Sequence, residues 1–130
     1  MAHSQERFRK RTEVGRWGEE EAAAYLIARG WTILARNFRW GRKEIDMIAR
    51  KGVITAFVEV KCRRGSACGH PLESITPLKR REIAEVARGW LRQSPQPPGT
   101  MVRFDAIGVQ MEAGGARRLI HVPDAWRLGV

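Results

Sequence analysis

The feature that most constrains the fold is the run from Val53 to Cys62, which alternates in the way a β-strand does. Glu59 and Lys61 are two positions apart, so in a strand they share one face at a spacing of roughly 6.6 Å. The opposite face is apolar and consists of Ile54, Ala56, Val58, Val60 and Cys62. A strand that buries one face and carries an acid and a lysine on the other is a candidate for metal-assisted chemistry.

Asp46 precedes Glu59 by twelve intervening residues and lies in a second strand-like run. In an antiparallel hairpin the two acids share a face when the paired positions sum to an odd number, as when Asp46 pairs with Glu59 or with Phe57. A slip of one residue separates them, and the turn at Arg50-Lys51-Gly52 allows both favourable registers. The apolar face of this strand is expected to carry Ile45, Met47 and Ala49.

Glu19 is a third acid at an unusual position. It stands three, four and seven residues before Ala22, Ala23 and Leu26, which places a carboxylate on the core-facing stripe of a predicted helix. A buried carboxylate needs a cation, a metal or a strong donor. The alternative is a surface glutamate at the edge of the stripe, paired with an arginine, and the spacing leaves both interpretations open.

The remaining pattern alternates helices and strands. Apolar spacing predicts a helix over residues 13–28 that ends at Gly30, and Thr76-Pro77 predicts the start of a second helix that continues to about residue 92. Strands are expected over residues 31–36, 44–49, 53–62, 101–109 and 119–122, with a basic-aromatic turn over 37–42 and a loop over 63–71. The order αβββαβ predicts one α/β domain over residues 13–130, after a flexible basic arm over 1–12.

The charge of the chain narrows the class of partner. The net charge is +10 at pH 7, which favours a polyanion, with nucleic acid as the first expectation and an anionic membrane surface as the rival. No apolar stretch is long enough to span a bilayer, and the first fifteen residues lack the apolar core of a signal peptide. A cytoplasmic protein is therefore expected.

The cysteines do not suggest a structural metal. Cys62, Cys68 and His70 form a loose Cys-x5-Cys-x-His cluster, whereas zinc sites use tighter pairs and a fourth ligand. Free thiols are expected instead, with Cys62 buried on the apolar face of its strand.

The acids and the lysine together suggest a hydrolytic site. Asp46 and Glu59 would supply oxygen ligands to Mg²⁺ or Mn²⁺, with the Val60 carbonyl as a further ligand. Lys61 would orient the attacking water or neutralise the phosphate, and Glu19 would reach the metal through water or hold Lys61 in place. The plainer interpretation of Glu59 and Lys61 is an ion pair on a solvated face.

Basic residues flank this hairpin on both sides and are the expected phosphate contacts, ringing a site on its open face. They are Arg36, Arg39, Arg42 and Lys43 before the motif, and Arg63 and Arg64 after it. Lys79 either reaches the site or extends past it to solvent. Phe38 and Trp40 are candidates for stacking on bases, although a core position is the favoured interpretation for Phe38.

These residues also carry a resemblance to a known family. Glu44-Ile45-Asp46-Met47-Ile48 and Phe57-Val58-Glu59-Val60-Lys61 resemble the PD-(D/E)-x-K nuclease motif. Over roughly residues 15–109 the chain resembles the YraN-like family of uncharacterised, predicted endonucleases; the further matches are Gly18-Glu19, residues 33–39, Lys79 and Arg103-Phe104-Asp105. Two positions depart from the family pattern, because Lys43 stands where glycine is usual and Cys62 where a small hydroxyl residue is usual.

The resemblance implies a restriction-endonuclease-like core with a mixed central sheet, similar to that of archaeal Holliday-junction resolvases. It implies that Glu19, Asp46, Glu59 and Lys61 are the catalytic positions of a Mg²⁺- or Mn²⁺-dependent endonuclease that cuts DNA rather than RNA, including branched or damaged DNA. A homodimer is left open, since resolvases of this kind cut two strands of a junction. The alternatives are a non-catalytic nucleic-acid-binding module on the same scaffold, or a basic protein that binds ribosomal RNA or an acidic partner.

Overall fold

The computed structural model describes residues 13–64 and 75–127. The predicted arm over 1–12, Cys68, His70 and most of the predicted 63–71 loop lie outside the described residues. The elements are, in chain order, α2 (Glu13–Ala28), β1 (Thr32–Trp40), β2 (Lys43–Lys51), β3 (Ile54–Arg64), α3 (Pro77–Gln93), β4 (Met101–Met111), the short 3₁₀ helix η2 (Ala113–Gly115) and β5 (Arg117–Val122).

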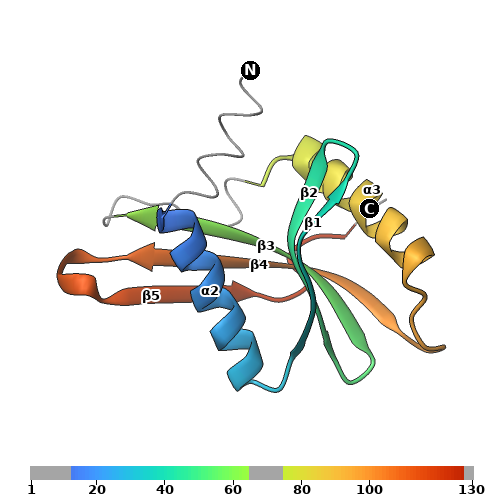
Figure 1. The fold of residues 1–130 in the computed structure, drawn as a ribbon, viewed down its shortest axis with the longest axis horizontal. Helices are drawn as coiled ribbons and strands as arrows, with labels where there is room; N and C mark the ends of the chain where they lie inside the picture. The colour runs from blue at the N-terminus through green and yellow to red at the C-terminus, as the bar shows by residue number, and fades with distance from the viewer. Residues whose placement is uncertain (1–12, 65–74, 128–130) are drawn as a thin grey trace.

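The five strands form one mixed sheet in the order β1-β2-β3-β4-β5 (Figure 1). The pairs β1–β2, β2–β3 and β4–β5 are antiparallel, whereas β3 and β4 run parallel. Parallel neighbours need a crossover connection, and α3 supplies it between β3 and β4. The expected α/β class is confirmed.

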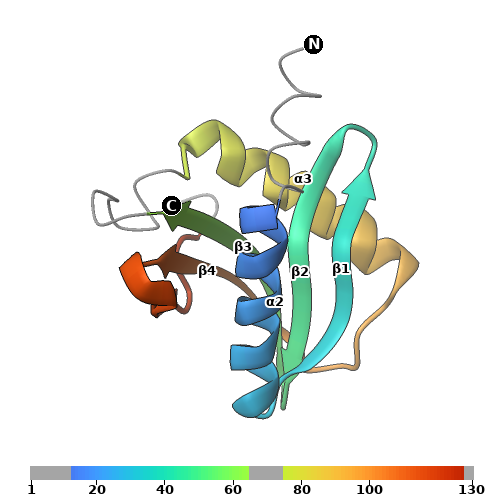
Figure 2. The same cartoon turned by 60° about the vertical axis from the view of Figure 1, so that its left-hand side comes forward.

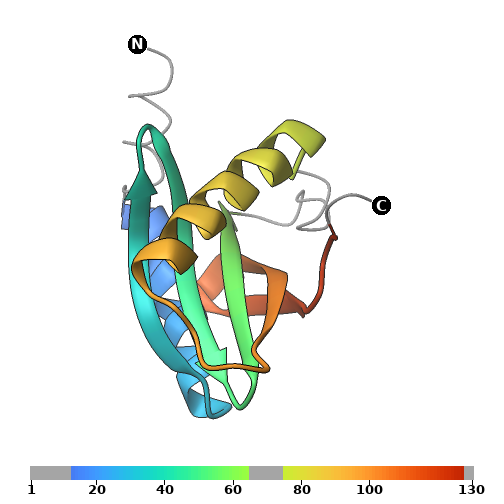
Figure 3. The same cartoon turned by 90° about the vertical axis from the view of Figure 1, so that its right-hand side faces the viewer.

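The two helices cover opposite faces of the sheet (Figures 2 and 3). Helix α2 packs its Ala22, Ala23 and Leu26 on a core cluster that includes Val58 and Val60 of β3. Helix α3 packs on a second cluster that includes Phe57 of the same strand. Strand β3 is therefore covered on both faces, unlike the half-exposed strand that its sequence suggested.

Local signals account for both helices. Helix α2 has the predicted bounds, and Gly30 follows it with φ 90°, a conformation that glycine adopts without strain. The side chain of Thr76 caps α3 by accepting a hydrogen bond from the backbone N–H of Lys79 at 3.1 Å, and Pro77 occupies the first turn. Two contacts show how closely the helices approach the sheet: a Cβ on Gly18 would overlap Cys62, and a Cβ on Gly89 would overlap the ring of Trp40.

Strand β1 corrects the prediction of a basic-aromatic turn over residues 37–42. The strand continues to Trp40, and β2 pairs Phe38 with Ile45 and Trp40 with Lys43. Asn37 has φ 50°, a left-handed conformation that asparagine tolerates, so the backbone bends there without ending the strand. Phe38 and Trp40 pack against the α3 core cluster, where the core interpretation of Phe38 holds.

The feature of the fold that positions the acids is a fork between β2 and β3. The two strands pair from Lys51↔Ile54 only as far as Met47↔Val58. Beyond that pair β2 stays bonded to β1, and β3 stays bonded to β4, so the strands diverge (Figure 1). The alternation of β2 breaks at the fork: Met47 and Ala49 join the α2 cluster as expected, but Ile45 joins the α3 cluster.

Within the part of the chain that the structure describes, no helix is long and apolar enough to cross a lipid bilayer.

Candidate active site

Three acids predicted from the sequence are buried: Asp46 and Glu59 at the fork, and Glu19 on the helix α2. Relative exposure is 0% for Glu59 on β3, 1% for Asp46 on β2 and 9% for Glu19 on α2. Each would lose a large hydration energy on burial if nothing compensated its charge. The contacts of these acids therefore decide what the site can do.

Glu59 lies between two lysines that come from different elements. Its Oε2 is 3.7 Å from Nζ of Lys61 on the same strand and 3.6 Å from Nζ of Lys79 on the first turn of α3. Lys79 was expected either to reach the site or to extend past it to solvent, and the structure shows that its ammonium group reaches Glu59. Glu59 has no solvent exposure and lies beside α3, so the plainer alternative, an ion pair on a solvated face, does not hold.

Asp46 is held at the fork by the backbone of β3. Its Oδ2 accepts a hydrogen bond from the N–H of Val60 at 2.7 Å. Because β2 has left β3 at this point, the carboxylate takes the place of the strand partner that would otherwise satisfy this N–H. Pairing ends at Met47↔Val58, and the same register extended by one residue would place Asp46 opposite Glu59, which is one of the two registers expected. The hydrogen bond with Val60 brings the Asp46 carboxylate to the residue next to Glu59.

Glu19 follows Gly18, the residue where α2 makes its closest approach to Cys62 of β3. Of the two interpretations left open for Glu19, the structure shows the buried one, since Glu19 is buried on the same helix as Ala22 and Ala23. Across residues 13–64 and 75–127, no three side chains of His, Cys, Asp or Glu are grouped as a metal site. A metal held here would therefore rest on Asp46 and Glu59 first, and the role of Glu19 stays a prediction.

Three of the predicted phosphate contacts are paired with acids in the protein. Arg36 lies 2.7 Å from Glu20, Arg39 lies 3.5 Å from Glu44, and Lys43 pairs with Glu85 of α3. All of these pairs are at least partly exposed to solvent, so each contributes little stability and opens at small cost. Binding of these three basic side chains to nucleic acid stays a prediction. Each side chain would have to leave its carboxylate partner and bind a phosphate instead.

The predicted contacts Arg42, Arg63 and Arg64 lie in the turn between β1 and β2 and at the end of β3. Arg42 is exposed in the turn between β1 and β2, and Arg63 is exposed and donates a hydrogen bond to the Cys62 carbonyl at 3.0 Å. Arg64 ends β3, and its side chain lies outside what the structure describes. Cys62 is half-buried, with Sγ 3.7 Å from the carbonyl of Gly15, which partly confirms its expected burial.

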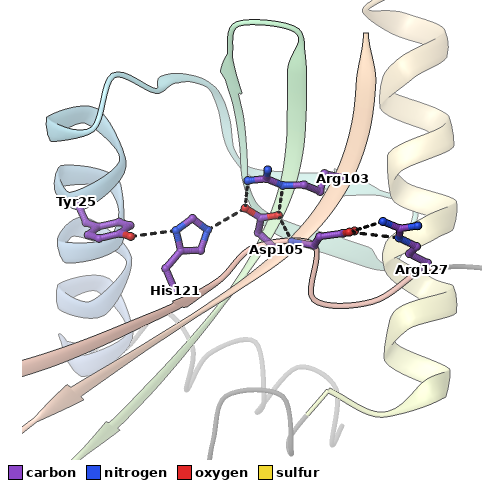
Figure 4. A network of polar contacts seen from close by, with 6 residues as sticks. Tyr25, Arg103, Asp105, His121 and Arg127 are labelled. Carbon is purple, nitrogen blue, oxygen red and sulfur yellow. Dashed lines mark hydrogen bonds and ion pairs between the residues drawn. The ribbon is translucent and has the colours of Figure 1, made fainter.

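A second polar cluster, which the sequence did not single out as a site, centres on Asp105 of β4 (Figure 4). Arg103 binds it with two hydrogen bonds of 2.8 and 2.9 Å, and His121 of β5 approaches it at 2.8 Å through Nε2. The backbone N–H of Asp124 adds a bond of 3.0 Å, while Tyr25 of α2 lies 3.1 Å from the other ring nitrogen of His121. The available signal was the Arg-x-Asp spacing, which places both side chains on one face of a strand.

These contacts hold Asp105 in its charged form. Burial acts to raise the pKa of Asp105, but the hydrogen bonds from His121, Arg103 and the Asp124 N–H outweigh it and lower the pKa below its usual value. The hydrogen bond with Asp105 raises the pKa of Arg103 in return. The cluster joins α2, β4, β5 and the C-terminal turn, so its geometry is that of a structural clamp.

Comparison with known proteins places the chain in a family. The model of the uncharacterised protein family UPF0102 matches residues 18–109, a stretch that contains all the acids and lysines of the site. A UPF0102 protein of Leifsonia xyli subsp. xyli is 46% identical over 112 residues, covering 86% of this chain and 93% of its own. One from Geotalea uraniireducens is 39% identical over 115 residues, covering 88% and 90%. The chain therefore belongs to the uncharacterised protein family UPF0102, which confirms the YraN-like resemblance of its sequence.

Proposed function

We propose that this protein is a metal-dependent endonuclease that hydrolyses phosphodiester bonds in DNA, with branched or damaged DNA as its substrate. The observation that carries the proposal is the fully buried Glu59 carboxylate between Lys61 and Lys79. The backbone N–H of the next residue, Val60, binds the Asp46 carboxylate, so the two acids lie close together. The order of elements, with a helix before the sheet and a crossover helix after β3, supports the restriction-endonuclease-like core that the resemblance implies.

The charged cluster is poorly explained by stability alone. A buried ion pair contributes little net stability, because desolvation of both charges offsets their attraction. Phe57 shows that the same face of β3 accommodates an apolar side chain two residues earlier. Buried titratable groups beside charged partners are enriched at functional sites. Chemistry is therefore the better explanation for the acids at the fork.

The donor set fits a divalent cation. Asp46 and Glu59 offer carboxylate oxygens, the hard ligands that Mg²⁺ and Mn²⁺ prefer, and the carbonyl of Val60, the residue after Glu59, would be a further oxygen donor. Glu19 would reach the metal through water. A bound ion of this kind polarises a phosphate and stabilises the charge that develops on its oxygens. The two ammonium groups beside Oε2 of Glu59 support this fit, because they mark a position that accommodates positive charge.

The side chains of the protein would divide the remaining work. Lys61 would orient the attacking water or neutralise the phosphate, since its side chain is 21% exposed beside the buried acid. Lys79 would contact the phosphate from the first turn of α3. Arg36, Arg39, Arg42, Lys43, Arg63 and Arg64 would position the DNA backbone around the fork.

The test is cleavage of four-way junction, flap and single-stranded DNA with Mg²⁺ or Mn²⁺. Asp46→Asn keeps an oxygen that can accept the Val60 N–H but removes the charge, so the fork is preserved while the ligand is weakened. We expect cleavage to fall by about 100-fold, the typical effect of losing one group that stabilises transition-state charge. Asp124→Asn is the matched control, because this exposed aspartate has φ 51°, which asparagine tolerates. Equal cleavage by wild type and Asp46→Asn refutes the assignment.

A second candidate is a nucleic-acid-binding module without catalysis. It is favoured by the two lysines themselves, which balance the charge of Glu59 without a metal. Calorimetry with Mg²⁺ and Mn²⁺ separates the two functions. DNA binding that weakens steeply with salt, together with no Asp46-dependent metal binding, supports the binding module.

A further inference from the structure

The two lysines at Glu59 approach the same carboxylate oxygen from different directions. Nζ of Lys61 lies 3.7 Å and Nζ of Lys79 lies 3.6 Å from Oε2. Lys61 lies two residues after Glu59 on the same face of β3, so its place near the acid follows from the strand itself. Lys79 belongs to α3, and its presence at Oε2 is a product of the tertiary fold. A single oxygen thus faces two ammonium groups and is also the predicted ligand of a divalent ion.

The first turn of α3 holds the backbone of Lys79 firmly in place. The side chain of Thr76 accepts the N–H of Lys79 itself at 3.1 Å. The backbone N–H of Arg80, the next residue, donates to the carbonyl of Thr76 at 3.0 Å, and Nε of Arg80 donates to the carbonyl of Ile75 at 3.2 Å. The Arg80 guanidinium lies 5.7 Å over the ring of Trp126. The backbone is anchored on both sides of Lys79, while its side chain is one-third exposed and has four rotatable bonds. The ammonium can therefore move without movement of the helix.

Competition at Oε2 follows from these positions. A divalent ion that binds Glu59 must displace an ammonium from Oε2 or bind in spite of its repulsion. A DNA phosphate at the fork offers Lys79 a new anionic partner within the reach of its side chain. When Lys79 turns to the phosphate, Glu59 becomes available to the metal.

We propose that Lys79 is a positioning residue that couples metal binding to DNA binding: it occupies Glu59 while DNA is absent and transfers to the phosphate when DNA binds. The inference rests on the proposed function, because it needs a metal at Asp46 and Glu59. Thermodynamic linkage makes the coupling reciprocal, so DNA tightens metal binding by the same factor by which metal tightens DNA binding. The site stays weakly loaded until its substrate arrives.

The experiment is calorimetric titration with Mn²⁺, with and without a four-way junction whose phosphorothioate linkages slow hydrolysis. In wild type, we expect the junction to tighten Mn²⁺ binding by about tenfold, within the usual range for coupled sites. In Lys79→Met, Mn²⁺ should bind about tenfold more tightly without DNA, and the junction should add less than about twofold. Lys79→Arg keeps the charge and should retain the coupling.

Controls separate this inference from the function on which it rests. Arg81→Met removes an exposed positive charge from the same helix and should leave both Mn²⁺ affinities within about twofold of wild type. Melting curves followed by circular dichroism report whether each variant is folded. If Mn²⁺ binding depends on Asp46 but is unchanged in Lys79→Met, the coupling is wrong and the metal site stands. If wild type and Asp46→Asn bind Mn²⁺ equally, or neither binds it, the proposed function fails and the coupling fails with it.

Discussion

Replacing Asp105 with asparagine perturbs a buried side chain on which four donors converge. Oδ1 accepts from Nε of Arg103 and the N–H of Asp124, while Oδ2 accepts from Nη2 of Arg103 and lies 2.8 Å from Nε2 of His121. An asparagine has one oxygen, so the donors at the other position would face an NH₂ group. Asp105→Asn therefore removes one negative charge and places the NH₂ group of asparagine against N–H donors, at a site with no solvent exposure.

The magnitude follows from these contacts. With the asparagine oxygen at the Oδ1 position, the bonds from Arg103 Nη2 and His121 Nε2 are lost. Hydrogen bonds to charged groups contribute about 1.5–3 kcal/mol each, and breaking a buried ion pair costs about 3–5 kcal/mol. The side chains of Arg103 and His121 are partly exposed to water, which recovers some of this loss. We expect the free energy of unfolding to fall by about 3 kcal/mol, out of the roughly 5–15 kcal/mol typical of a domain.

Urea denaturation at pH 7 measures this loss, and Asp124→Asn is the matched control with an expected change below about 1 kcal/mol. The pH dependence gives an independent check. Because the folded protein lowers the pKa of Asp105, its contribution is fully present above the unfolded value of about 3.9 and is lost as the pH falls through the folded pKa. The difference between wild type and Asp105→Asn should therefore shrink below about pH 4. A pH-independent difference, or a loss no larger than that of the control, would refute the charged clamp.

Three further substitutions test the packing of both helices on the sheet and the cap of α3. Gly18→Ala should cost about 1–3 kcal/mol, because the new Cβ overlaps Cys62, and adding Cys62→Ala should recover part of the loss in urea titrations. Gly89→Ala should cost a similar amount and change the fluorescence of Trp40, whose ring occupies the space of the new Cβ. Thr76→Ala should cost about 1 kcal/mol, read as a lower melting temperature, through loss of the α3 cap. Full wild-type stability in the glycine variants would contradict the close approach of helix and sheet.

Elements with local signals were predictable from the residues around them. Helix α2 has the predicted bounds because its apolar spacing and the glycine stop at Gly30 depend only on neighbouring residues. Helix α3 starts as predicted because Thr76 and Pro77 cap it without help from the rest of the fold. Strand β1 was predicted to end too early, since its last residues are held by pairing with β2 and no local pattern shows this pairing.

In the candidate site, too, some residues were placed by local sequence pattern and others only by the tertiary fold. Alternation in β3 placed Glu59 and Lys61 on one face, because that placement depends only on short-range periodicity. The apolar stripe of α2 offered a core position for Glu19 but left a surface position open, and only the fold decided between them. The place of Lys79 at Glu59 was left as one of two alternatives, because it depends on where a helix that begins eighteen residues after Glu59 returns to the sheet. The acid partners of Arg36, Arg39 and Lys43 could not be predicted in the same way, since all three lie on other elements.

The sequence by itself determined the α/β class, both helices, the acids at their strand and helix positions, and a net charge of +10. These properties follow from periodicity and composition, which need no knowledge of distant contacts. Only the tertiary structure decided that β2 leaves β3 at Met47, that the Asp46 carboxylate then satisfies the N–H of Val60, and that α3 brings a second ammonium to Glu59. The physical reason is that strand divergence and helix crossover are set by packing of the whole sheet between its two helices, and packing brings together residues that the chain keeps far apart.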